Sequence, residues 1–126
     1  MSVGAHRRVA VATIEPKGRC CPRLHEAVEL VGKRWTGAIV AVLLEGGTMR
    51  FSEIAQRIPH ISDRLLSERM KELEARGVVE RHVHSDSSVR VEYELTPKGI
   101  GLLPVIEEMR RFGHDWLVHD PRHRHA

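Results

Sequence analysis

The fold of this 126-residue chain is best predicted from residues 50–77, RFSEIAQRIPHISDRLLSERMKELEARG. Apolar residues recur at helical spacing on both sides of Pro59, which ends a first predicted helix over residues 51–58. Ser62 is a favourable N-cap for a second helix, and Gly77 stands where a left-handed residue commonly closes one. Two helices joined by a short turn form a candidate helix-turn-helix.

Two further helices are predicted before this segment. The first begins at Pro22 and ends near Gly32, and the second, over residues 35–44, is more apolar and ends at Gly46-Gly47. Residues 1–19 show no sustained period and hold several basic side chains. They predict a flexible basic N-terminal arm, in which residues 9–14 could form a short strand.

After the second helix of the motif the period changes. Apolar and polar residues alternate over Val79–Val83 and over Val89–Leu95, on either side of the turn-forming cluster Ser85–Ser88, which predicts a two-stranded hairpin with one buried face. Thr96-Pro97 opens another helix, and an apolar stripe continues over residues 102–117 after a break near Gly101 and Pro104. Residues 118–126 are predicted to be a polar, His-rich tail.

Composition excludes several classes of protein. The longest apolar stretch is about half the length of a membrane-spanning helix, and the two cysteines are adjacent, so we expect no membrane segment, no disulfide framework and a cytoplasmic location. There is no Gly-rich phosphate loop and no nucleophile elbow, so we predict neither an enzyme nor a cofactor. The net charge is +3, with five basic residues and one acidic residue in positions 1–23. An anionic partner is therefore worth testing.

The order of these elements is that of a winged helix, with residues 20–117 as the domain. A recognition helix presents polar side chains to base edges while its other face packs inward. On the helix after Ser62, the polar face carries the candidates for base readout, which are Arg64, Ser67, Glu68 and Lys71. The alternative is a solvated face of alternating charge.

Contacts with the DNA backbone are predicted for three other side chains. They are Arg50, Ser62 and, on the wing hairpin, Arg90. For Arg90 the alternative is a cross-strand ion pair with Glu80 or Glu92.

Six motifs in order make residues 20–117 resemble the HxlR-type winged helix-turn-helix regulators, a MarR-like group. They are Cys21-Pro22, Gly32–Trp35, Arg50–Ile54, Ile61–Leu66, Lys71–Val79 and Val89–Gly99. Two positions depart from the family pattern, since the wing tip lacks a proline and Phe112-Gly113 replaces a Trp-Gly pair.

The resemblance implies a homodimeric regulator of transcription, with a repressor-like role, that binds double-stranded DNA at a pseudo-palindromic operator. Its first and last helices are expected to form the dimer interface through Leu24, Val28, Met109, Phe112, Trp116 and Leu117.

The resemblance also implies that Cys21 is a candidate sensor of oxidants or electrophiles. A helix N-terminus and the flanking Arg19 and Arg23 favour the reactive thiolate. With Cys20 adjacent, a disulfide would have to cross the dimer. The alternative is an unreactive cysteine packed against a partner helix.

Two other functions stay open. One is a metal-responsive regulator with ligands among Cys20, Cys21, His114, His119, His123 and His125, although their spacing fits no standard site and no metal is predicted. The other is a winged-helix module that binds protein instead of DNA.

Overall fold

The computed structural model describes residues 21–117 of the chain. Two compact units are present, Met1–Lys33 and Arg34–Ala126, and each is described by itself. In the first unit, helix α2 (Pro22–Val31) begins after Cys21 with Pro22 in its first turn. The predicted first helix is thus confirmed. The predicted arm, its potential strand and the His-rich tail lie outside the described residues, and the domain boundaries stay predictions.

The second unit holds all the remaining elements. In chain order they are α3 (Thr36–Gly46), β1 (Met49–Arg50), α4 (Phe51–Arg57), α5 (Asp63–Ala75), β2 (Val79–His84), β3 (Arg90–Leu95), α6 (Pro97–Ile100) and α7 (Leu103–Trp116). This order confirms the predicted helix-turn-helix, the hairpin and the break before the last helix. Helix α3 starts one residue later than predicted, because Trp35 has a left-handed backbone with φ 76°.

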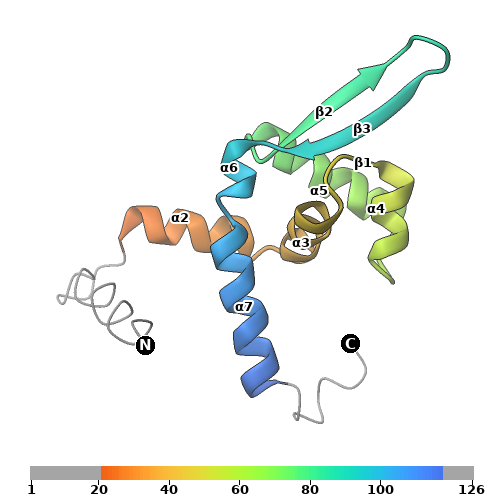
Figure 1. Cartoon of the computed structure of the whole chain (residues 1–126). Coiled ribbons are helices and arrows are strands. Elements are labelled where there is room, and N and C mark those ends of the chain that lie inside the picture. The colour runs from red at the N-terminus through yellow and green to blue at the C-terminus, as the bar shows by residue number, and fades with distance from the viewer. Residues whose placement is uncertain (1–20, 118–126) are drawn as a thin grey trace. The chain divides into compact units, whose positions relative to one another are not determined.

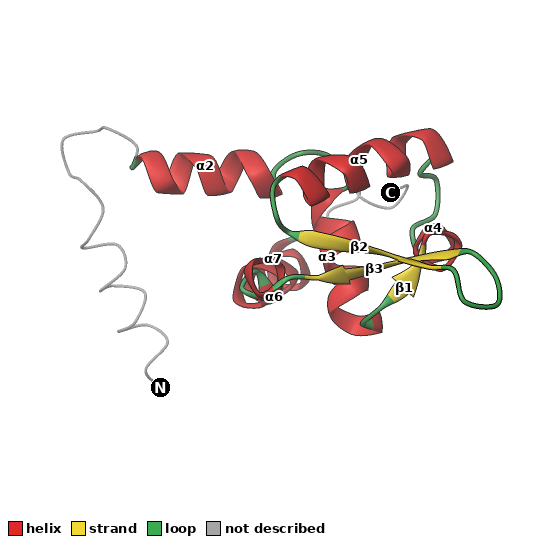
Figure 2. Cartoon of the chain, turned by 90° about the horizontal axis from the view of Figure 1, so that it is seen from above, coloured by secondary structure: helices red, strands yellow, loops and turns green. Residues whose placement is uncertain are grey.

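The sheet has a strand that the sequence analysis missed. The strands are antiparallel in the order β1-β3-β2, and Met49 of β1 pairs with Tyr93 of β3 (Figure 2). Strand β1 is two residues long, so it shows no alternation that a pattern search could detect. It matters because it ties the start of α4, and therefore the helix-turn-helix, to the wing.

The core of the second unit is aliphatic. Its most deeply buried side chains come from α3, α4, α5 and the start of β2, and they include Ile39, Val40, Leu43, Ile54, Leu66, Met70, Val78 and Val79. Helix α5 packs against β2, and α3 contacts both α4 and α7. No helix within residues 21–117 is long and apolar enough to cross a bilayer.

The prediction that one whole face of the hairpin is buried is wrong. Val79 and Leu95 at its base are buried, but Val83 is 54% exposed and Val89 is 76% exposed. The hairpin extends beyond the helices of this unit, so its outer half has no element to pack against (Figure 1). Apolar residues near the tip therefore face solvent, whereas the base of the wing is anchored to the core.

Candidate nucleic-acid interface

Helix α5 is held in place at its start and along its inner face. The Ser62 hydroxyl accepts the backbone N–H of Leu65 at 3.1 Å, as predicted for an N-cap. Leu66 and Met70 are almost fully buried. Arg69, which sequence analysis passed over, donates from Nε to the backbone oxygen of Arg34 at 2.9 Å. These contacts fix the orientation of α5 before any ligand binds.

The four candidates for base readout lie together on the outer face of α5. Arg64, Glu68 and Lys71 are exposed and Ser67 is half-buried. Arg64 Nε lies 3.4 Å from Glu68 Oε2, and the Arg64 side chain is 89% exposed. An exposed pair of this kind contributes at most about 1 kcal/mol to stability. The Arg64 guanidinium can therefore exchange this partner for another at little cost.

Arg50 and Ser62 each stand at the start of a helix of the motif. The backbone N–H of Arg50 donates to the Glu53 carboxylate at 2.8 Å, and the Arg50 side chain is 57% exposed beside the same carboxylate. The Ser62 oxygen accepts a hydrogen bond from Leu65, but its hydroxyl hydrogen is still able to donate. Both positions can thus offer a donor to an anion from a helix N-terminus.

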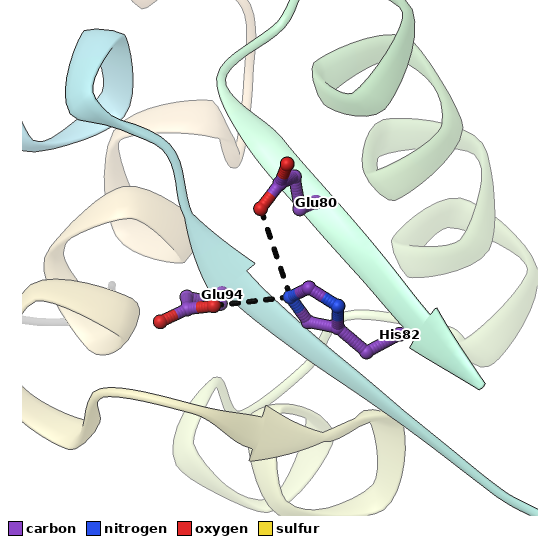
Figure 3. A group of neighbouring side chains, drawn as sticks. All are labelled: Glu80, His82 and Glu94. Carbon is purple, nitrogen blue, oxygen red and sulfur yellow. Dashed lines mark hydrogen bonds and ion pairs between the residues drawn. The ribbon is translucent and has the colours of Figure 1, made fainter. Parts of the chain in front are cut away.

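One face of the wing is a ladder of histidines and carboxylates. Glu80 and Glu94 are directly opposite each other on β2 and β3, and His82 lies beside them. Figure 3 shows His82 Nε2 facing both carboxylates, at 3.7 Å from Glu80 Oε1 and 3.0 Å from Glu94 Oε1. The three ligand atoms lie within 4.8 Å of one another, so this group could hold a divalent cation. It differs from the residues considered for a metal in the sequence analysis.

Arg90 is not the isolated cation that its place near the wing tip suggests. Its guanidinium lies 3.6 Å from Asp86 and 3.9 Å from Glu92. The alternative of an ion pair with Glu92 is therefore observed, but the pair does not cross between strands, because Glu92 is on the same strand as Arg90 and Asp86 is in the turn. Residues 77–95 hold two basic and four acidic side chains. The wing is consequently net negative when its histidines are neutral.

The last helix exposes an apolar surface. Met109 is 51% exposed, Phe112 57% and Trp116 72%, while Leu117 just beyond the helix is 36% exposed. Met109, Phe112 and Leu117 also line a shallow groove of about 650 Å³ on α7. In the first unit, Leu24 and Val28 of α2 are exposed as well. All six residues predicted for a dimer interface are therefore accessible in the single chain.

Cys21 is the N-cap residue of α2 and is exposed. That is the position expected for a thiol that meets reagents from solution. Cys20 and three of the histidines considered as metal ligands, His119, His123 and His125, lie outside the described residues. His114 is exposed and its Nδ1 lies 3.4 Å from the Asp115 carboxylate.

Comparison with known proteins identifies the family to which this architecture belongs. A model of the HxlR-like helix-turn-helix family matches residues 30–121, which include both helices of the motif and the wing. This chain belongs to the HxlR-like helix-turn-helix family. The resemblance drawn from its six motifs is confirmed.

Relatives in this HxlR-like family cover most of the chain. The uncharacterized HTH-type transcriptional regulator YvaP of Bacillus subtilis is 47% identical over 97 residues, which are 77% of this chain and 89% of YvaP. The reduced form of the transcriptional regulator YodB of B. subtilis superposes with a TM-score of 0.70 at 43% identity, covering 79% of this chain and 97% of YodB. Quinone-bound YodB superposes with a TM-score of 0.65 at 44% identity, covering 76% of this chain and 99% of YodB.

These matches settle the class of function. The HxlR-like chain is a DNA-binding regulator of transcription and not an enzyme. The predicted mainly helical winged fold with a small antiparallel sheet is likewise confirmed.

Proposed function

We propose that this HxlR-like regulator binds a pseudo-palindromic operator as a homodimer, with α5 of each protomer in the major groove. The observation that carries this proposal is the division of α5 into two faces. Leu66 and Met70 fix one face in the core, and Arg64, Glu68 and Lys71 leave the other open. A rigid helix with an accessible polar face is what direct base readout requires.

Each exposed side chain has a distinct role in this proposal. Arg64 and Lys71 donate to guanine edges or phosphates, and Ser67 donates or accepts. Glu68 accepts from cytosine or orients Arg64, to which it is already paired at 3.4 Å. Arg50 and Ser62 donate to phosphates from the two helix starts. Arg90, which is shared between Asp86 and Glu92, contributes a weaker backbone contact at the wing.

Dimerisation rests on the uncovered apolar side chains of α7. Met109, Phe112 and Trp116 follow one another at helical spacing, and each is more than half exposed. A contiguous exposed apolar surface of this kind marks an interaction site on a soluble protein. A two-fold axis would place the two α5 helices about 34 Å apart, one turn of DNA.

A redox or electrophile response through Cys21 is the regulatory part of the proposal. Cys21 is exposed at the start of α2, and the similar protein YodB has a quinone-bound crystal structure. The Cys21 thiolate would add to a ring carbon of a quinone, forming a carbon–sulfur bond, and the ring would gain a proton to become a substituted hydroquinone. No separate oxidant is needed for this step.

Fluorescence anisotropy with labelled DNA from upstream of the chain's own gene tests DNA binding. We expect tight binding. The logarithm of the association constant should fall linearly with the logarithm of the salt concentration, with a slope of about −0.9 per phosphate neutralised. Arg64→Ala should lose discrimination between this DNA and a shuffled sequence, while the control Arg111→Ala on α7 should keep it. Binding that is absent at low salt would favour the protein-interaction module instead.

The same assay, repeated after quinone treatment, tests the switch. We expect the quinone to weaken operator binding by the native chain and by Cys20→Ser, and to leave Cys21→Ser unaffected. An equal loss of operator binding in Cys21→Ser after quinone treatment would show that Cys21 is not the responding thiol. The DNA-binding proposal would be unaffected by that result.

A further inference from the structure

A pocket of about 790 Å³ lies within the second unit, beside α3, the turn between α4 and α5, and α7. Its size falls in the range of about 300–1,000 Å³ that is usual for small-molecule sites. No residue predicted for base readout or dimerisation lines it. The pocket therefore has no role in the function proposed above.

Small side chains create the space. Ala38 and Ala41 point from α3 into the pocket at a spacing of three residues, and Val42 continues the same wall. Ile58 and Pro59, from the end of α4 and the turn, add further apolar lining. A flat hydrocarbon body would contact the carbon atoms of these side chains.

The charged residues at the pocket are mostly cationic. Arg34, Arg57 and Arg110 line it with a single carboxylate, Glu45. Glu45 is shared, since Arg57 lies 2.9 Å from its Oε1 and Arg110 lies 4.0 Å from its Oε2. The Arg34 guanidinium lies 4.9 Å from the centre of the Trp35 ring, and no carboxylate within residues 21–117 is in ion-pair contact with it. Three guanidinium groups against one carboxylate favour an anionic ligand.

Trp35 adds an independent indication. It lines the pocket, and its indole Nε1 is buried with no hydrogen-bond partner in the part of the chain that the structure describes. A buried donor without an acceptor is costly and usually has a reason. Trp35 also has φ 76°, a sparsely populated backbone conformation for a non-glycine residue, and such conformations cluster at functional sites.

We propose that this pocket binds an organic anion that carries a carboxylate on a flat apolar body. The carboxylate would accept from Arg34 and Arg110, which are the guanidinium groups least committed to Glu45, and the body would lie on Ala38 and Ala41. Trp35 is one of the residues in the wall that the bound molecule covers. This proposal does not depend on DNA binding, and its test uses no DNA.

The test compares 2-naphthoate with its neutral analogue 2-naphthamide in ¹H–¹⁵N spectra of the full chain. The chain has two tryptophans, so its two indole N–H signals can be assigned with Trp35→Phe and Trp116→Phe. We expect 2-naphthoate to shift the Trp35 signal in a saturable manner while the Trp116 signal stays in place. We expect the amide to bind about tenfold more weakly or worse, since it lacks the charge.

Two pairs of variants locate the site. Ala41→Leu fills the pocket and should abolish the shift, while Ala75→Leu at the exposed end of α5 should not. Arg110→Gln should weaken 2-naphthoate binding several-fold, while Arg111→Gln, the next residue on α7, should leave it unchanged. Arg110 and Arg111 are both exposed, so their substitution should not prevent folding. These two variants therefore still test the site if Ala41→Leu fails to fold. Equal binding of acid and amide, no saturable shift, or undiminished binding by Arg110→Gln would overturn the proposal.

Discussion

Gly99→Ala should destabilise this protein through one close contact at the base of the wing. Gly99 is buried in α6, and an alanine Cβ at this position would clash with the backbone oxygen of Val78 and lie 2.8 Å from Leu95 Cδ2. The Val78 oxygen cannot move freely, because it accepts the Thr96 N–H at 3.0 Å and the Thr96 hydroxyl at 3.2 Å. The added methyl must therefore push α6 away from the strand or break these bonds.

The expected cost follows from these contacts. Overpacking a rigid site costs about 1–3 kcal/mol, and a weakened hydrogen bond adds about 1 kcal/mol. The better helix propensity of alanine recovers about 1 kcal/mol at most. The net loss of about 2 kcal/mol corresponds to a melting temperature lower by about 8–16 °C for a domain of this size.

Gly37→Ala is the matched control. Gly37 lies in the first turn of α3, and an alanine methyl at this position would have no tertiary neighbour within 4 Å, so it meets open space. This variant should be more stable by about 0.5 kcal/mol, because alanine loses less entropy on folding. Circular dichroism melts of both variants at one protein concentration check the opposite signs. If Gly99→Ala melts at or above the native temperature, the close packing of α6 on the wing base is refuted.

Three further outcomes are expected. Leu66→Ala should lower the free energy of unfolding by about 2–5 kcal/mol in urea titrations, because Leu66 is fully buried on the inner face of α5. A loss below about 1 kcal/mol would contradict this. Phe112→Asp should shift the sedimentation coefficient from dimer to monomer, since it places a charge in the exposed apolar stripe of α7; an unchanged oligomer would exclude that stripe as the interface. Arg50→Ala should reduce the salt dependence of DNA binding by about one counterion without altering sequence preference. A change in preference would instead assign Arg50 to base readout.

The motif helices were predictable because their signals are local. Pro59 ends one helix, Ser62 caps the next, and the burial of Leu66 and Met70 follows from their spacing. The same spacing places Arg64 on the opposite face. Capping and periodicity act within a few residues, so the chain alone carries them.

Other features depended on contacts between distant segments. Strand β1 exists only because Met49 and Arg50 pair with β3, more than forty residues later in the chain. The contact of His82 with Glu94 follows from the register of β2 on β3, which alternation alone leaves undetermined. The sequence analysis passed over Arg69, whose Nε donates to the backbone oxygen of Arg34, 35 residues earlier in the chain.

The sequence by itself therefore determined the order of elements, the family and the polar face of α5, since these depend on short-range periodicity, capping and motif order. The tertiary structure decided what surrounds each charge and where space remains. It set His82 of β2 beside the Glu94 carboxylate of β3, and it gathered Arg34, Arg57 and Arg110 around one pocket. Electrostatic partners and cavities form between segments that are remote in the chain, and no local pattern records them.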